Sequence, residues 1–137
     1  MSTAIDTIKV FCDGGSRGNP GPAASGVVFT TTDDKTIATF SQYLGVATNN
    51  VAEYQAMNLA LKKLADFSFS KVEFYLDSEL VVKQLKGEYR VKNNDLRVIY
   101  HEIVKALGGL SDTISHVRRE YNKLADQAVN DCLDSHA

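Results

Sequence analysis

The sequence predicts an α/β domain built on a mixed five-stranded sheet, and three observations support this fold class. The 137 residues, 44% hydrophobic and 23% charged, suit one globular core, so we expect residues 1–137 to form a single domain. Three consecutive segments alternate apolar and polar residues, as strands do. Later segments of helical period alternate with two more strands, giving the order βββαβααβα. The first three strands then form an antiparallel meander, and helices connect the two later, parallel strands.

The N-terminal part holds the three strands of the meander. Residues 7–13 alternate in polarity, which is the pattern of a strand with one buried face. The run Gly14–Pro22 is rich in glycine and proline and predicts a tight, fixed loop. Residues 23–31 are small or β-branched and predict the second strand. Residues 32–35 carry a hairpin-turn signal, and residues 36–43 return as the third strand.

The remaining chain alternates helices with two strands. A helix is expected over residues 50–66, capped by Asn49 or Asn50, and Glu53 stands three residues beyond Asn50 as in a capping box. The elements expected after it are a strand over 72–77, a short helix over 78–86 stopped by Gly87, a helix from Asn93 or Asn94 to 107, a strand over 113–118 and a helix over 121–134.

Composition argues against several classes of protein. No stretch approaches the roughly 18 consecutive apolar residues of a membrane-spanning helix. The segment Met1–Asp6 lacks the basic and apolar regions of a signal peptide, so we expect a cytoplasmic protein without membrane association. Cys12 and Cys132 lie far apart and outside any C-x-x-C pair. We interpret both as buried thiols, and we expect neither a zinc site nor a disulfide.

The charge is distributed unevenly along the chain. The net charge is −2, with −3 in residues 1–82, +4 in residues 83–123 and −3 in residues 124–137. A negative net charge is unusual for a nucleic-acid-binding protein, but the basic middle segment offers a surface for phosphates. A bound cation would neutralise part of the acidic charge if some of the acids are metal ligands.

Four carboxylates occupy positions that favour a shared site. Asp13 and Asp77 end the first and fourth strands, while Glu53 and Asp126 fall in the first turns of two helices. If those strands are parallel neighbours, Asp13 and Asp77 meet at one edge of the sheet. Crowded carboxylates repel each other, and with no His or Cys nearby such oxygens favour Mg²⁺ or Mn²⁺. On spacing alone the acids are equally explained as surface residues and as helix-terminus residues stabilised by the helix dipole.

The glycine-rich run after Asp13 also has two interpretations. It is not G-x-G-x-x-G and no helix follows it, which argues against a Rossmann nucleotide site. Gly14 and Gly15 beside an aspartate let a ligand come close to the backbone. A plain β-turn explains the same residues as well.

Four segments resemble the motifs of the type 1 ribonuclease H family, in the order and spacing of that family. They are residues 11–22 (FCDGGSRGNPGP), 48–54 (TNNVAEY), 76–81 (LDSELV) and 116–126 (HVRREYNKLAD). The resemblance covers essentially the whole chain and is to a short form without a basic protrusion. It implies the ribonuclease H-like fold and hydrolysis of the RNA strand of RNA·DNA hybrids, with two Mg²⁺ ions and Mn²⁺ as a substitute.

The resemblance also implies roles for individual residues. Asp13, Glu53, Asp77 and Asp126 would be the catalytic and metal-binding set, with Asp13 bridging two ions and products carrying 5′-phosphate and 3′-hydroxyl ends. The implied contacts to the RNA strand are Gly14, Gly15, Asn19, Asn49 and Asn50, and those near the DNA phosphate are Thr48 and Asn93. Helix capping and turn formation are alternative explanations for the asparagines before the first helix.

Two departures from the family pattern concern product release and hybrid binding. The best-known members carry a loop histidine that assists release, whereas shorter-loop relatives offer an arginine. We expect His116 to be packed in the fifth strand, so Arg119 is the better candidate, ahead of Arg118. The basic protrusion is absent, which leaves a weaker basic surface and predicts weak, salt-sensitive hybrid binding. That surface comprises Lys83, Lys86, Arg90, Lys92 and Arg97, with Tyr89 as a sugar or base contact.

Two alternatives to the hybrid-specific nuclease stay open. Resolvases and integrases share this sheet and carboxylate chemistry but act on DNA, and a non-catalytic hybrid-binding module would keep the fold alone. The match over the whole chain argues against the first. The intact set of four acids argues against the second. We expect a monomer, and no protein partner is evident.

Overall fold

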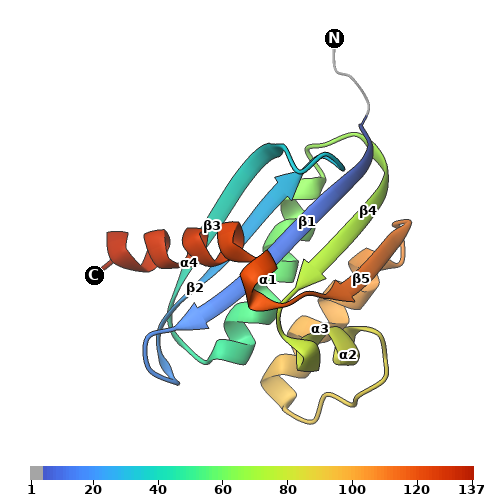
Figure 1. Cartoon of the computed structure of the whole chain (residues 1–137). Helices are drawn as coiled ribbons and strands as arrows, with labels where there is room; N and C mark the ends of the chain where they lie inside the picture. Colours follow the sequence, from blue (N-terminus) through green and yellow to red (C-terminus); the bar gives the residue numbers. More distant parts are fainter. Residues whose placement is uncertain (1–4) are drawn as a thin grey trace.

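The computed structural model describes residues 5–137, and its centre is one mixed sheet (Figure 1). The strands are β1 (Ile5–Ser16), β2 (Gly21–Thr30), β3 (Thr36–Ala47), β4 (Phe69–Leu76) and β5 (Asp112–His116). Their order across the sheet is β3-β2-β1-β4-β5. The β1–β2 and β2–β3 pairs are antiparallel, whereas β1–β4 and β4–β5 are parallel. The predicted fold class is therefore confirmed.

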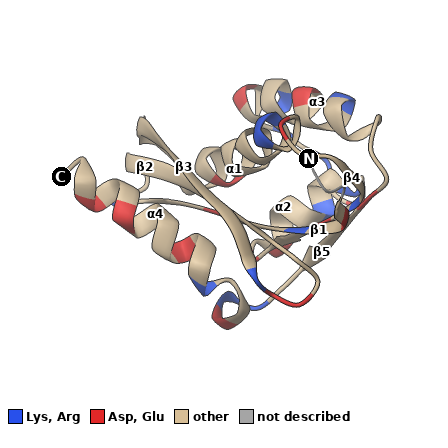
Figure 2. Ribbon diagram, turned by 90° about the horizontal axis from the view of Figure 1, so that it is seen from above, with Lys and Arg blue, Asp and Glu red and all other residues tan. Residues whose placement is uncertain are grey.

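Helices cover both faces of the sheet. They are α1 (Asn49–Leu64), α2 (Glu79–Leu85), α3 (Asn94–Leu107) and α4 (Lys123–Ser135), with a 3-10 turn, η1, at Arg119–Tyr121. Figure 2 shows α4 on one side of the sheet and α1 with α3 on the other. The element order is as predicted except for the added turn, which delays the start of the last helix from residue 121 to Lys123.

The main core lies between the sheet and α1. Ala52, Ala56 and Ala60 recur every four residues on the buried face of α1, and these small side chains let the helix lie close to the sheet. The phenol of Tyr54 donates a buried hydrogen bond to the amide of Gln84 on α2. A smaller apolar cluster under α4 includes Cys132. Both cysteines are free and buried, as predicted.

The loop predicted over Gly14–Pro22 was wrong at both ends. β1 continues three residues beyond Asp13, and Gly14–Ser16 pair with Ala23–Ser25 of β2. The backbone N–H of Arg17 donates to the carbonyl of Pro22 at 2.8 Å, which closes the hairpin. Only residues 17–20 remain as the turn, so Asp13 lies inside β1, where it pairs with Gly26 of β2.

The predicted start of the first helix was also wrong. Thr48 is the cap, since its hydroxyl accepts the N–H of Val51 at 3.2 Å, and neither Asn49 nor Asn50 caps the helix. Glu53 then falls in the second turn, so neither a capping box nor the helix dipole explains it. In α3 the cap is Asn93, one of the two residues predicted.

Other boundaries differ by at most four residues from those predicted, and the start of β3 and the end of α3 coincide with them. No helix within residues 5–137 is long and apolar enough to cross a membrane. Residues 1–4, part of the segment that argued against a signal peptide, lie outside the described range.

Candidate active site

The four predicted acids line one cavity of about 270 Å³. Cys12 of β1 pairs in parallel register with Leu76 of β4, so the next residues, Asp13 and Asp77, lie side by side at the edge of the sheet. Glu53 reaches the cavity from α1, and Asp126 reaches it from the first turn of α4. Four elements distant in sequence therefore meet at one site.

Two glycines let the helices that carry Glu53 and Asp126 approach the sheet. A Cβ atom at Gly14 would lie 2.4 Å from the backbone nitrogen of Glu53. A Cβ atom at Gly26 would lie 2.6 Å from the carbonyl oxygen of Ala125, next to Asp126. Both distances are far below van der Waals contact, so only glycine fits with the helices where they are. The Ser25 hydroxyl, which donates to the carbonyl of Ala52 at 2.7 Å, fixes α1 further.

Burial, followed by the charges of neighbouring acids, raises the pKa of Asp13. Burial raises the pKa of Asp13 to about 8, and the negative charges of Asp77 and Asp126 add to this effect. A hydrogen bond from the Gly14 backbone opposes it, while a hydrogen bond shared with Asp126 favours the protonated form. The charges of two neighbouring acids thus add to the rise in the pKa of Asp13.

Glu53 is perturbed in the same direction. Burial raises the pKa of Glu53 to about 7, opposed by the Ser78 hydroxyl; the Asp77 charge raises it and the Arg119 charge lowers it. One carboxylate oxygen of Glu53, Oε2, is buried and has no hydrogen-bond partner among the described residues. A buried carboxylate oxygen without a partner is costly, and a cation at that point would remove the cost.

These donors fit hard divalent cations. All four are carboxylates, and no His or Cys nitrogen or sulfur lines the cavity. Among residues 5–137, no group of three or more His, Cys, Asp or Glu side chains is arranged to hold a metal ion by itself. Carboxylate oxygens are nonetheless the ligand type that divalent cations such as Mg²⁺ take in proteins, together with water and substrate phosphate.

Asn122 is a functional candidate that the sequence analysis missed. It is 1% exposed and stands four residues before Asp126. Its Nδ2 donates to the carbonyl of Cys12 at 2.8 Å and to Oδ2 of Asp77 at 3.1 Å. The sequence offered only a weak signal, a polar residue just before a helix, which is usually a cap.

Asparagines and a serine join the β1–β2 turn to the start of α1. The amide oxygen of Asn49 accepts from the backbone N–H of Ser16 at 2.9 Å and from its hydroxyl at 3.1 Å. The backbone N–H of Asn49 donates to the amide oxygen of Asn19 at 3.1 Å. Asn49 lines the cavity with Gly14 and Gly15. The turn that carries Asn19 is therefore held beside the acids.

The other predicted contacts are more scattered. Arg119 lines the cavity. Thr48 is occupied as the cap of α1, and Asn50 is exposed on the first turn of that helix. Asn93 lies at the start of α3, where its amide oxygen accepts from the backbone of Asp95 at 2.9 Å and of Leu96 at 3.2 Å. Neither Thr48, Asn50 nor Asn93 lines the cavity, whereas the unpredicted residues Ser16, Arg17 and Asn130 do.

His116 and the basic segment differ in part from expectation. His116 belongs to β5, as predicted, but it is the last residue of that strand and is exposed, so its interpretation as a packed residue was wrong. Residues 86–93 join α2 to α3 without another helix, in agreement with a missing protrusion. Within the basic surface, Lys83 pairs with Glu79 at 3.0 Å and lies 4.9 Å from the ring centre of Tyr89.

Comparisons with known proteins agree with this site. A family model described as reverse transcriptase-like matches residues 11–132. Ribonuclease HI of Halobacterium salinarum is 43% identical over 128 residues, which are 93% of this chain and 64% of that protein. Bifunctional protein Rv2228c of Mycobacterium tuberculosis is 39% identical over 133 residues, 95% of this chain and 36% of that protein. The chain thus spans less than two thirds of either relative.

A solved structure is similar over nearly its whole length. LC11-RNase H1, whose crystal structure is a complex with an RNA/DNA hybrid, matches with a TM-score of 0.89 and 38% identity, over 94% of this chain and 98% of that one. The family match runs from Phe11 to Cys132 and so includes all four acids of the cavity. On these grounds the chain belongs to the type 1 ribonuclease H family.

Proposed function

We propose that this chain is a metal-dependent endoribonuclease that hydrolyses the RNA strand of RNA·DNA hybrids and leaves 5′-phosphate and 3′-hydroxyl ends. The observation that carries the proposal is the meeting of Asp13, Glu53, Asp77 and Asp126 in one cavity. The raised pKa values of Asp13 and Glu53 support a site built for cations, since the acids are costly to ionise together without them. The hybrid bound to LC11-RNase H1 supports the substrate class.

In this proposal the four carboxylates hold two Mg²⁺ ions, which Mn²⁺ can replace. Bound there, the ions would supply activation of the attacking water and charge stabilisation at the leaving 3′-oxygen. Asp13 is the best candidate for a shared ligand, because the charges of both Asp77 and Asp126 act on it. The protein itself contributes no nucleophile, so its residues act by positioning and charge.

Selection of RNA over DNA would fall to the turn and the start of α1. The 2′-hydroxyl distinguishes the two strands, and amide side chains can both donate to it and accept from it. Asn19, Asn49 and Asn50, with the backbone of Gly14 and Gly15, are the proposed contacts to the RNA strand. The hydrogen bonds among Ser16, Asn19 and Asn49 support this role by fixing the turn before substrate binds.

The DNA strand would bind farther from the acids. Asn93 uses its amide oxygen to cap α3, so the N–H groups of the same amide are the donors proposed for a DNA phosphate, together with Thr48. The basic surface around α2 and α3 would extend this contact. We propose weak, salt-sensitive binding, because Lys83 is already paired with Glu79.

Arg119 is proposed to assist product release in place of the usual histidine. It is exposed, lines the cavity and acts by its charge on Glu53. An exposed cation at the rim can attract the new 5′-phosphate away from the metal ions that the carboxylates would hold.

Cleavage of an end-labelled RNA·DNA hybrid tests the proposal, with Mg²⁺ or EDTA, beside single-stranded RNA, duplex RNA and duplex DNA. We expect cutting of the hybrid's RNA strand alone, only with the metal, and none with Asp77→Asn, which should still fold. Cutting of duplex DNA would instead indicate a resolvase-like enzyme. Tight hybrid binding without cleavage under both Mg²⁺ and Mn²⁺ would indicate a binding module.

A further inference from the structure

The strongest unassigned feature of the site is Asn122, whose buried amide bonds two of the four acid-bearing segments and whose backbone begins the helix of a third. Its Nδ2 group donates to the carbonyl of Cys12, the residue before Asp13, at 2.8 Å. The same nitrogen donates to Oδ2 of Asp77 at 3.1 Å. The backbone carbonyl of Asn122 accepts the N–H of Asp126 at 3.1 Å. One residue therefore connects β1, the end of β4 and the start of α4.

The side chain is not used as its position in the chain would suggest. Asn122 stands at the cap position of α4, where asparagine normally accepts a backbone N–H of the first turn. Here it makes no such bond. Its amide is directed into the site instead, so the local stability of the helix does not account for this residue.

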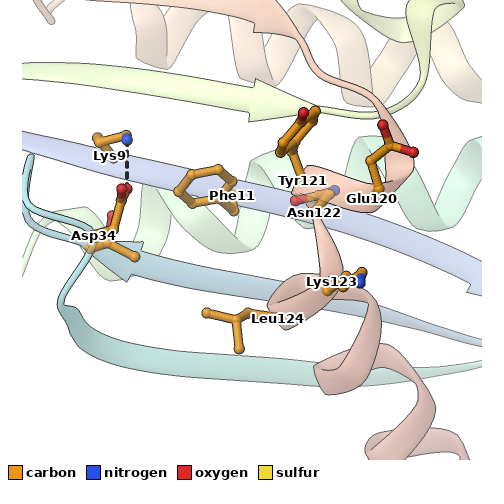
Figure 3. Close-up of a pocket in the computed structure, with 9 residues that line it drawn as sticks. Lys9, Phe11, Asp34, Glu120, Tyr121, Asn122, Lys123 and Leu124 are labelled. Carbon is orange, nitrogen blue, oxygen red and sulfur yellow. Dashed lines mark hydrogen bonds and ion pairs between the residues drawn. The ribbon is translucent and has the colours of Figure 1, made fainter.

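The orientation of the amide is determined by its partners. A carbonyl and a carboxylate both require donors, so turning the amide over would bring its oxygen against two acceptors. The oxygen, Oδ1, is buried and has no hydrogen-bond partner among the described residues. Figure 3 shows Asn122 at the wall of a second cavity, of about 360 Å³, with Phe11 and Tyr121. The Nδ2 end of the amide is therefore hydrogen-bonded to the site, whereas the Oδ1 end has no partner among the described residues.

We propose that Asn122 is a positioning residue that sets the Asp77 carboxylate and the end of β1 relative to α4. Holding one oxygen of Asp77 by an N–H donor limits rotation of the carboxylate and leaves its other oxygen for a cation. Partners that hold metal ligands in this way typically matter by 10- to 100-fold in metal affinity or activity. The inference rests on the proposed metal-dependent function of the four acids.

The test compares Asn122→Asp and Asn122→Ala with wild type and with Gln127→Ala. Gln127 is a matched control, because it is exposed on α4 and its amide bonds only Asp131, at 2.7 Å. For the Asn122 variants we expect kcat on the hybrid to fall about 10- to 100-fold, with KM changed less than about threefold. Calorimetry with Mg²⁺ alone should give weaker binding by a similar factor for Asn122→Ala, which removes the donor without adding a charge. Gln127→Ala should match wild type in both measurements.

A folded Asn122 variant with wild-type kcat and Mg²⁺ affinity would overturn the proposal, as would a loss of kcat that only follows the unfolded fraction. If wild type itself does not cut the hybrid, the proposed function fails, while the Mg²⁺ comparison still tests Asn122. If neither variant folds, nitrogen-15 spectra of wild type decide. The Asn122 side-chain N–H signals should exchange slowly and shift when Mg²⁺ is added; fast exchange or no shift would contradict the proposal.

Discussion

The first turns of α1 lie against β1 so closely that a Cβ atom on Gly14 would stand 2.2 Å from the carbonyl carbon of Ala52. The carbonyl oxygen of Ala52 would be 2.4 Å from the same atom. Glu53, the residue after Ala52, is thereby brought to the cavity that holds Asp13. The absence of a side chain at Gly14 is thus a requirement for assembling the carboxylates, besides any approach of substrate.

Replacing Gly14 by alanine should move α1 and separate Glu53 from Asp13. We expect Gly14→Ala to lower the free energy of unfolding by about 1–3 kcal/mol, the usual cost of overpacking against backbone. Hybrid cleavage should fall by about 100-fold, since a displacement of about 1 Å is enough for such a loss. Denaturant unfolding and steady-state cleavage measure the two effects.

Gly15→Ala is the matched control for stability. A Cβ atom at Gly15 would meet only Cγ1 of Val129, at 3.6 Å, which is an ordinary contact. The free energy of unfolding should therefore stay within about 0.5 kcal/mol of wild type. If Gly14→Ala and Gly15→Ala lower the free energy of unfolding equally, the close approach of α1 is not the reason why position 14 requires glycine.

The raised pKa of Asp13 predicts that its charge destabilises the metal-free protein. Its ordinary pKa of 3.8 rises to about 8 in the folded chain, so the folded state binds this proton more tightly than the unfolded state. Between about pH 4 and pH 8, stability from this group falls as the pH rises. Asp13→Asn removes the charge and should raise the unfolding free energy at pH 8 by about 1–3 kcal/mol, while cleavage is lost.

Thermal unfolding in EDTA at pH 5.5 and pH 8 measures this effect. Wild type should lose stability over that interval, and Asp13→Asn should lose less. Mg²⁺ should raise the Tm of wild type at pH 8 more than that of the variant, because binding to the folded state alone stabilises it. A variant less stable than wild type at pH 8 without metal would argue against repulsion at this site.

The sequence predicted the fold class, and it predicted that Asp13 and Asp77 meet on the condition that their strands are parallel neighbours, which the structure shows. Strand alternation identified β1 and β4, and a parallel pair brings residues that follow equivalent positions to the same edge. Glu53 and Asp126 were also singled out by their positions, but only the motifs that resemble the family assigned them to a metal site. Their roles could not be fixed from periodicity, because helix-terminal acids have a local explanation in the helix dipole.

Tertiary contacts explain what the sequence could not predict. Thr48, Asn49 and Asn50 can each cap a helix, and Thr48 is the one that does so here. The amide oxygen of Asn49 accepts a hydrogen bond from Ser16 instead, a residue 33 positions away in the chain. Asn122 likewise bonds Cys12, 110 residues away. Gly26 accommodates α4 at a position where the sequence shows only one glycine within a strand. Each of these depends on a partner that local pattern does not identify.

Asn49 should contribute to stability and to substrate binding, whereas Asn50 should contribute to binding alone. Asn49→Ala removes both hydrogen bonds from Ser16, which should cost about 1–2 kcal/mol of unfolding free energy. The turn would loosen, and the KM for the hybrid should rise. The exposed Asn50, replaced by alanine, should leave stability unchanged while raising KM. Unchanged KM in both variants would remove these asparagines from the proposed RNA contact.

Arg119 should favour the ionised form of Glu53 near neutral pH. Its charge lowers the pKa of Glu53, which burial raises to about 7, so Arg119→Ala should raise that pKa further. The ionised fraction at pH 6.5 then falls, and the acidic limb of the kcat/KM profile should move to higher pH. We expect kcat/KM at pH 6.5 to fall about 3- to 10-fold, as for an exposed charge worth about 1 kcal/mol.

Arg119→Lys keeps the charge and should restore the profile. Arg118→Ala is the control, since Arg118 pairs with Glu120 at 3.7 Å and does not line the cavity. If Arg119→Ala lowers the rate equally at all pH values, Arg119 acts on product release and not through Glu53.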